Sequence, residues 1–268
     1  MNALKILLTA SLLTVLHLAP AYAQITQRVV EIASRPGVTQ RMIVLTPPDA
    51  KAAVVLLAGG HGGLQIAPDG SFKWGNGNFL VRTRQEFAGQ GLLVAVIDAP
   101  SDRQSPPFLN SFRQTSEHVT DLKAVIAWLR ENAKLPVWLV GTSRGTQSAA
   151  FIATELSAAP NRSEGPDGIV LSSTILTDHK SRPVSNMPLA QIQIPVLVIH
   201  HEQDACNHCA YAGTAALMEK FEHAPRKQLL SFKGGENRGD PCEAFAYHGF
   251  NGLEREVVAQ TAAWILAK

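Results

Sequence analysis

A short stretch, residues 135–145, constrains the fold of this chain more than any other. Its first half is an apolar run that ends at Gly141, as expected for a buried strand. A Gly-x-Ser-x-Gly pattern spans Gly141 to Gly145, and residues 146–156 after it are compatible with a helix. A strand that turns sharply into a helix needs small residues on both sides of the turn, and the serine between them is held exposed and strained. The sequence therefore predicts a strand–turn–helix unit with Ser143 at its apex.

Apolar runs and amphipathic segments alternate along the rest of the chain. Two short runs, 27–33 and 40–45, flank a Pro-Gly turn and predict an antiparallel pair. Further strands are expected at 52–58, 91–97, 168–172, 194–200 and 226–232, and helices at 79–90, 115–132, 210–222 and 253–267. Strands that alternate with helices predict one α/β domain, in which helices cover both faces of a mostly parallel sheet. In such sheets the site lies at the carboxyl ends of the strands.

The first 23 residues have the features of a secretory signal peptide. Lys5 gives a positive start, residues 6–18 are largely apolar, and residues 21–23 read Ala-Tyr-Ala. The apolar run is too short to span a bilayer comfortably, so no stable membrane anchor is expected. We therefore predict cleavage near Ala23, a mature domain at 24–268, and a periplasmic or secreted protein.

The charge balance argues against polyanionic partners. The chain has 24 Lys and Arg against 22 Asp and Glu, which leaves no basic field for nucleic acid or an anionic membrane. A small-molecule substrate fits this composition better.

Four features in chain order resemble the α/β-hydrolase superfamily. His61 and two glycines follow the first buried strand, and the Gly-x-Ser-x-Gly pattern surrounds Ser143. An Ile-Pro-Val-Leu-Val-Ile run leads to Asp204, and His248 lies in a loop before the last helix. The order Ser, Asp, His is that of the superfamily. Tyr247 departs from the glycine that such families often have before the histidine.

The resemblance covers roughly the whole mature chain. It implies an α/β-hydrolase fold, here without a large lid domain, because only residues 173–193 separate two predicted strands where a lid could be inserted. It also implies an exported serine hydrolase that cleaves carboxylic esters through an acyl-enzyme and needs no cofactor. Peptidases, thioesterases and lactone hydrolases use the same machinery, and a non-catalytic binding protein can share the fold. A binding protein, however, would not need the complete ordered triad.

The resemblance assigns a role to each member of this triad. Ser143 is the nucleophile and needs a base, for which His248 is the best placed histidine. Asp204 would hold His248 in the correct tautomer and stabilise its cation. Asp178, after the preceding strand, is the alternative position that some members use for the acid, and Asp240 is a weaker alternative.

Two backbone N–H groups are needed to stabilise the oxyanion. One is expected from Arg144, directly after the nucleophile. The second is expected from Gly63, with Gly62 as the alternative, because glycine lets the backbone approach a substrate closely. No Gly-Lys-Ser or Gly-Lys-Thr signature follows, so this glycine cluster does not indicate a phosphate loop.

The three cysteines, Cys206, Cys209 and Cys242, favour a disulfide in an exported protein. The loops that carry Cys206 and Cys242 are expected to leave neighbouring parallel strands, which favours their pairing and leaves Cys209 a buried thiol. A Cys209–Cys242 bond remains the alternative. The Cys-x-x-Cys spacing could also serve zinc or redox chemistry, but the chain has no second such motif, so no metal is predicted.

Overall fold

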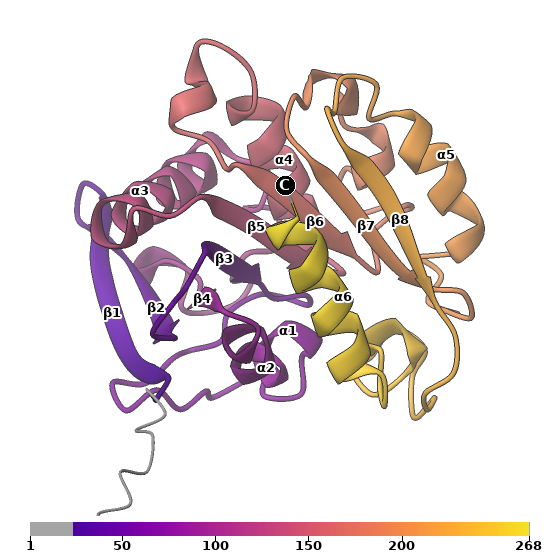
Figure 1. Ribbon diagram of the computed structural model, residues 1–268, viewed down its shortest axis with the longest axis horizontal. Helices are drawn as coiled ribbons and strands as arrows, with labels where there is room; N and C mark the ends of the chain where they lie inside the picture. The colour runs from indigo at the N-terminus through magenta and orange to yellow at the C-terminus, as the bar shows by residue number, and fades with distance from the viewer. Residues whose placement is uncertain (1–23, 268) are drawn as a thin grey trace, which may run out of the picture.

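A mixed eight-stranded sheet forms the centre of the computed structural model, which describes residues 24–267 (Figure 1). The predicted signal peptide at 1–23 lies outside the described residues. The strands are β1 (Thr26–Arg35), β2 (Val38–Thr46), β3 (Ala52–Leu57), β4 (Leu92–Ile97), β5 (Val137–Thr142), β6 (Gly168–Ser172), β7 (Val196–His201) and β8 (Lys227–Phe232). Their order in the sheet is β1-β2-β4-β3-β5-β6-β7-β8. β1 and β2 pair antiparallel, β2 pairs antiparallel with β4, and every later pair is parallel, which confirms the predicted mostly parallel sheet.

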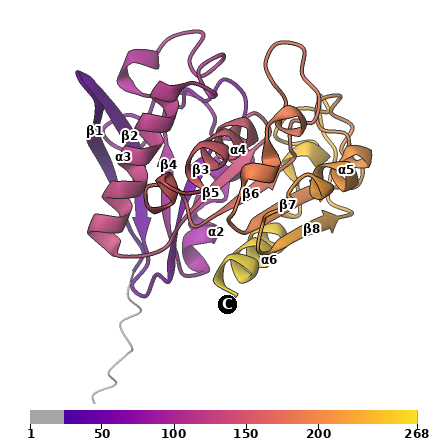
Figure 2. The same cartoon turned by 90° about the horizontal axis from the view of Figure 1, so that it is seen from above.

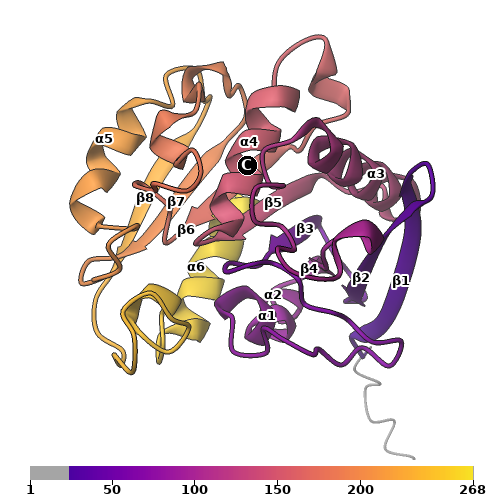
Figure 3. The ribbon, with the colours of Figure 1, turned by 180° about the vertical axis from the view of Figure 1, so that it is seen from behind.

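Helices cover both faces of the sheet (Figure 2). The helices are α1 (Phe79–Arg82), α2 (Arg84–Gly89), α3 (Ser116–Ala133), α4 (Gly145–Leu156), α5 (Thr214–Glu219) and α6 (Glu254–Leu266). α3, α4 and α5 pack on one face and are seen from their own side in Figure 3. α1, α2 and α6 pack on the other face.

Two predicted helices are shorter in the structure than in the sequence analysis. The segment 79–90 is divided at Thr83, whose hydroxyl donates to the carbonyl of Phe79 at 2.7 Å. In the segment 210–222 the first turn is a 3-10 turn, Tyr211–Gly213, and only Thr214–Glu219 is α-helical. The remaining predicted elements lie within a few residues of their expected bounds.

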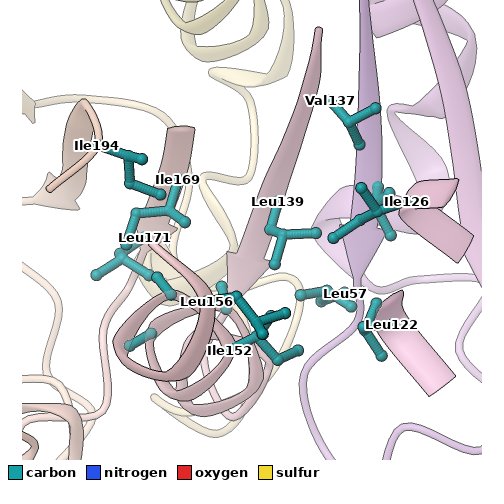
Figure 4. Packing of buried hydrophobic residues seen from close by; sticks show 14 of the residues in the cluster. Leu57, Leu122, Ile126, Val137, Leu139, Ile152, Leu156, Ile169, Leu171 and Ile194 are labelled. Carbon is teal, nitrogen blue, oxygen red and sulfur yellow. The ribbon is translucent and has the colours of Figure 1, made fainter. Parts of the chain in front are cut away.

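The central strands owe their position to apolar residues on both faces. β3, β4, β5, β6 and β7 are buried along their whole length. Figure 4 shows Leu122 and Ile126 of α3 and Ile152 of α4 packed towards Leu57 and Leu139 of the sheet. Full burial of one such side chain stabilises the fold by about 1.5–3 kcal/mol. This core fixes the carboxyl ends of β3, β5, β6 and β7, from which the site residues emerge.

No helix within residues 24–267 is both long enough and apolar enough to cross a bilayer.

Candidate active site

The turn after β5 holds Ser143 in a strained backbone conformation. Its φ is +51°, in the left-handed region that serine rarely occupies. The flanking glycines are required by space, because a Cβ on Gly145 would overlap the carbonyl of Leu57 and one on Gly141 would overlap the carbonyl of Gly145. The Ser143 N–H donates to the carbonyl of Ser172 on β6 at 2.9 Å. The sequence pattern thus forms the expected sharp turn between β5 and α4.

Asp204 and His248 form a buried pair beside this turn. Nδ1 of His248 lies 2.9 Å from Oδ2 of Asp204, and both residues are less than a tenth exposed. The other carboxylate oxygen, Oδ1, accepts the N–H of Cys206 at 2.9 Å, which fixes the orientation of the carboxylate. Nε2 of His248 is buried and has no hydrogen-bond partner within the described residues. Ser143 and His248 line the same cavity, of about 580 Å³.

The loop that carries His248 is held from several sides. The hydroxyl of Ser173 donates to the carbonyl of His248 at 2.6 Å, and Arg82 donates to the carbonyl of Gly249 at 2.6 Å. The ring of Tyr247 stacks on that of His201, with centroids 4.3 Å apart and planes 6° from parallel. Tyr247 therefore packs the histidine loop against the end of β7.

The two alternative acids bond to groups other than His248, although Asp240 lines the same cavity as Ser143. Asp178 accepts from Arg144 at 2.7 Å and from Ser181 at 2.5 Å. Burial alone would raise the pKa of Asp178, but the hydrogen bonds from Ser181 and Arg144 outweigh it and hold the pKa below its usual range. Asp240 is exposed and accepts the N–H of Cys242 at 2.8 Å. Of the three candidate acids, only Asp204 contacts His248.

Gly63, predicted to supply an oxyanion donor, is not brought to the cavity. Its N–H donates to Nδ1 of His61 at 3.1 Å, and a Cβ at this position would overlap the ring of Phe108. The carboxylate of buried Asp98 accepts the N–H groups of Leu64, Gln65 and Ile66 at 2.8–3.0 Å. These bonds anchor residues 64–66 beside Asp98, and neither Gly62 nor Gly63 lines the cavity that contains Ser143. Gly62, the alternative donor, packs against Arg113 and Leu109.

Gly59 and Gly60 occupy the place expected of Gly63. Both line the cavity with Ser143, and a Cβ on Gly59 would lie 3.0 Å from Cβ of Ser143. Within the described residues, the N–H groups of Gly60 and Arg144 have no protein acceptor. Sequence reasoning named Arg144 but neither Gly59 nor Gly60, because the His-Gly-Gly pattern points to Gly62 and Gly63. The position of Gly59 and Gly60 directly after the strand was the signal that could have found them.

A disulfide joins the two loops that carry Asp204 and His248. It links Cys206 to Cys242, whose Cα atoms lie 4.6 Å apart, and Cys209 is a free buried thiol. This is the pairing favoured by the sequence. Cys206 lies two residues after Asp204 and Cys242 six residues before His248, so the bond ties the acid loop to the histidine loop.

Opening this disulfide is expected to destabilise the protein. The bond spans 36 residues along the chain, and loop-closure entropy for a loop of that length corresponds to about 4 kcal/mol at most. A reductant should lower the melting temperature of the wild type and leave that of the Cys206→Ser/Cys242→Ser double variant unchanged. A wild type that melts at the same temperature after thiol titration has shown the bond to be open would contradict this expectation.

Cys206, Cys209 and His248 together could offer donor atoms to a metal, since these atoms lie within 4.8 Å of one another. The donor set does not fit while the disulfide is closed, because the sulfur of Cys206 is then not a thiolate. Nδ1 of His248 is also already bonded to Asp204. We derive no catalytic step through a metal at this position.

Buried His200 at the end of β7 makes stability depend on pH. Its Nε2 accepts the N–H of Thr174 at 2.7 Å, and burial lowers its pKa from 6.5 to about 4. As the pH falls, His200 is protonated in the unfolded chain before it is protonated in the folded protein. The stabilisation that comes from neutral His200 is therefore fully present above about pH 6.5 and is lost as the pH falls towards 4. At pH 5 the loss is about 2 kcal/mol. His118, whose pKa is lowered by burial to about 3, contributes a loss of stability over the same range in both proteins. Urea unfolding at pH 7.5 and pH 5 should therefore show a loss that is about 2 kcal/mol smaller in His200→Gln than in the wild type, and equal losses would be contrary to expectation.

Comparison with known proteins supports the fold. No protein-family model matches this chain, and neither does any curated protein sequence. Among solved structures, a dienelactone hydrolase from Anabaena variabilis is similar at 16% identity and a TM-score of 0.62, covering 91% of this chain and 98% of its own. A Pyrococcus furiosus esterase is similar at 16% identity and a TM-score of 0.59, covering 94% and 96%. A cold-adapted esterase from an Arctic intertidal metagenomic library is similar at 15% identity and a TM-score of 0.57, covering 90% and 92%.

These proteins match nearly the whole described chain. The structure also has the elements expected from the sequence at their expected places, namely the mostly parallel sheet, the strained serine turn after β5 and the histidine loop before α6. The chain therefore adopts the α/β-hydrolase fold.

Proposed function

We propose that this protein is an exported serine hydrolase that cleaves carboxylic esters of small molecules through an acyl-enzyme. Ser143 is the nucleophile, His248 the general base and Asp204 the orienting acid. The observation that carries this proposal is the buried Asp204–His248 pair, whose histidine lines the same cavity as Ser143 at its strained turn. A structural histidine in a loop would not require a carboxylate at Nδ1 and an unpartnered Nε2 at the same time.

The proposed reaction begins with attack of Ser143 Oγ on the ester carbonyl. Nε2 of His248 takes the serine proton, and Asp204 stabilises the resulting imidazolium through Nδ1. Among the described residues no hydrogen bond joins Ser143 Oγ to Nε2, and such bonds are often long in free enzymes and tighten when substrate binds. His248 then gives the proton to the departing alcohol. A water molecule, activated by the same histidine, releases the acid and restores Ser143.

The proposed oxyanion donors are the backbone N–H groups of Gly60 and Arg144. Both belong to residues that line the Ser143 cavity, and neither has a competing protein acceptor in the part of the chain that the structure describes. Arg113 holds this loop by donating to the carbonyls of Ala58 and Gly60 at 3.0 and 3.2 Å. Preset donors of this kind stabilise charge that develops in the transition state without reorganisation.

Ester hydrolysis is supported by the kinds of protein that share the fold, which include esterases and a dienelactone hydrolase. Export is supported by the signal-peptide features of residues 1–23 and by the Cys206–Cys242 disulfide, since such bonds persist outside the reducing cytosol.

The test is hydrolysis of p-nitrophenyl esters from acetate to octanoate, with the matching p-nitroanilides and thioesters as comparisons. The proposal expects saturable hydrolysis of esters that exceeds that of the anilides, together with covalent labelling by a fluorophosphonate probe. Absence of both labelling and ester hydrolysis would refute it. Faster turnover of anilides or thioesters would instead assign the site to a peptidase or thioesterase.

A further inference from the structure

A second cavity, of about 490 Å³, adjoins the one that contains Ser143. Four basic residues and no acidic residue are part of its lining: Arg113, Arg144, Lys180 and Arg182. Arg144 lines both cavities, so the two lie on either side of this residue. A ligand at Ser143 that reached past Arg144 would enter the basic cavity.

Arg113 is a buried cation without a counter-ion. It is 5% exposed, and its guanidinium donates to neutral acceptors, namely the hydroxyl of Ser148 and the carbonyls of Ala58 and Gly60. Within residues 24–267, Nε of Arg113 is buried and has no hydrogen-bond partner, and no salt bridge joins Arg113 to a carboxylate. Burial, and to a smaller extent the charge of Arg144, lowers the pKa of Arg113 to about 9, so Arg113 stays cationic at neutral pH. A buried charge without an opposite charge destabilises the protein unless a ligand supplies one.

The other cations leave the cavity with excess positive charge. Arg144 is paired with Asp178 at 2.7 Å. Lys180 and Arg182 are exposed, and neither has a carboxylate partner in the described part of the chain. Guanidinium and ammonium groups in this arrangement offer several charge-assisted hydrogen bonds to the oxygens of an anion.

We propose that this cavity binds an ionised carboxylate of the substrate while the ester carbonyl lies at Ser143. The substrates would then be half-esters of dicarboxylic acids, in which one acid group is esterified and the other is free. The inference rests on the proposed esterase function and adds the substrate class. Arg144 would contact both functional groups of the substrate. Its backbone N–H would donate to the oxyanion, and its side chain would lie beside the free carboxylate.

A purely structural role for Arg113 does not account for the whole cavity. Its bonds to the carbonyls of Ala58 and Gly60 position the glycine loop, and that role needs no further cations. Lys180 and Arg182 contribute nothing to that loop, yet they line the same cavity. Arg182 donates to the side chain of Gln114 at 3.0 Å and lies over the ring of Phe151, and neither contact neutralises its charge. An anionic ligand would compensate the charge that remains in the cavity.

The test compares p-nitrophenyl half-esters of succinic, glutaric and adipic acids with the same compounds whose free carboxylate is blocked as a methyl ester. The measured quantity is the ratio of kcat/KM for the ionised compound to that for the blocked one. For at least one chain length the wild type should favour the ionised compound by about tenfold or more, and 0.5 M NaCl should reduce this preference.

The informative variant is Lys180→Gln/Arg182→Gln, and Lys220→Gln is the matched control because Lys220 is exposed and does not line this cavity. The double variant should lose most of the preference, about tenfold, because kcat/KM for the ionised esters falls. Lys220→Gln should keep the preference.

Three results would overturn the inference. The first is a ratio near one at every chain length in a wild type that hydrolyses the blocked esters, which leaves the esterase function intact. The second is a loss of preference in Lys220→Gln that equals the loss in Lys180→Gln/Arg182→Gln. The third is competitive inhibition by inorganic phosphate that is stronger than inhibition by the free dicarboxylates and is lost in the double variant, which would assign the cavity to a phosphate-bearing ligand. Failure of the esterase function itself would appear separately, as loss of ester hydrolysis and of probe labelling.

Discussion

Ser143→Ala is expected to lower kcat for the best p-nitrophenyl ester by about a million-fold, the magnitude seen when a triad serine is removed. Alanine has no group that can form the acyl-enzyme, so the reaction is left with the oxyanion donors and substrate binding alone. The strained turn should persist, because Gly141 and Gly145 and the bond from the residue 143 N–H to Ser172 are unaffected. Initial rates at saturating substrate measure the effect.

Ser116→Ala provides the control, since Ser116 is an exposed serine at the start of α3. It should hydrolyse the ester at the wild-type rate. A Ser143→Ala variant that is folded by circular dichroism and retains more than about a hundredth of the wild-type kcat would show that another residue is the nucleophile.

Asp204→Asn is expected to lower kcat by about four orders of magnitude. The asparagine amide would donate to Nδ1 of His248, which places the remaining ring proton on Nε2 and prevents that atom from accepting the serine proton. The shapes of the two side chains are nearly the same, and the N–H of Cys206 can still bond to the remaining oxygen, so folding should be little affected. The measurement is kcat together with the midpoint of thermal unfolding.

Asp178→Asn separates the two candidate acids. Asp178 contacts Arg144 and Ser181 and does not contact His248, so its amide variant should retain activity within roughly tenfold of the wild type. A large loss in Asp178→Asn and a small one in Asp204→Asn would reverse the assignment.

Most of the fold could be predicted because its signals are local. Each central strand is an uninterrupted apolar run, and α3 and α6 show apolar residues at helical spacing. Of the two helices that are shorter than predicted, one is divided and the other begins later, in each case because of local structure. Thr83 bonds back to the carbonyl of Phe79, and the turn Tyr211–Gly213 precedes α5. Such contacts leave little trace in the periodicity of a sequence.

The candidate site was predictable where chain order carries the information. Ser143, Asp204 and His248 follow in the order of the superfamily, each after a recognisable strand or before the last helix. The proposed second oxyanion donor could not be predicted in this way, because the choice between Gly60 and Gly63 depends on the loop anchored by Asp98, which follows another strand.

The basic cavity could not be predicted at all from the sequence. Arg113 comes from the loop before α3, and Lys180 and Arg182 come from the segment after β6. No motif links these positions, and the net charge of the chain is close to zero. Only the fold brings them to one side of Arg144.

The central claim is that Ser143 is the nucleophile of a serine hydrolase, and mapping the site of a fluorophosphonate adduct tests it most directly. The mature protein is treated with the probe, digested, and examined by tandem mass spectrometry. The account predicts one phosphonylated residue, Ser143, at close to one adduct per chain, and no adduct after heat denaturation. An adduct on any other residue, or an unmodified Ser143 in a protein that hydrolyses esters, would contradict it.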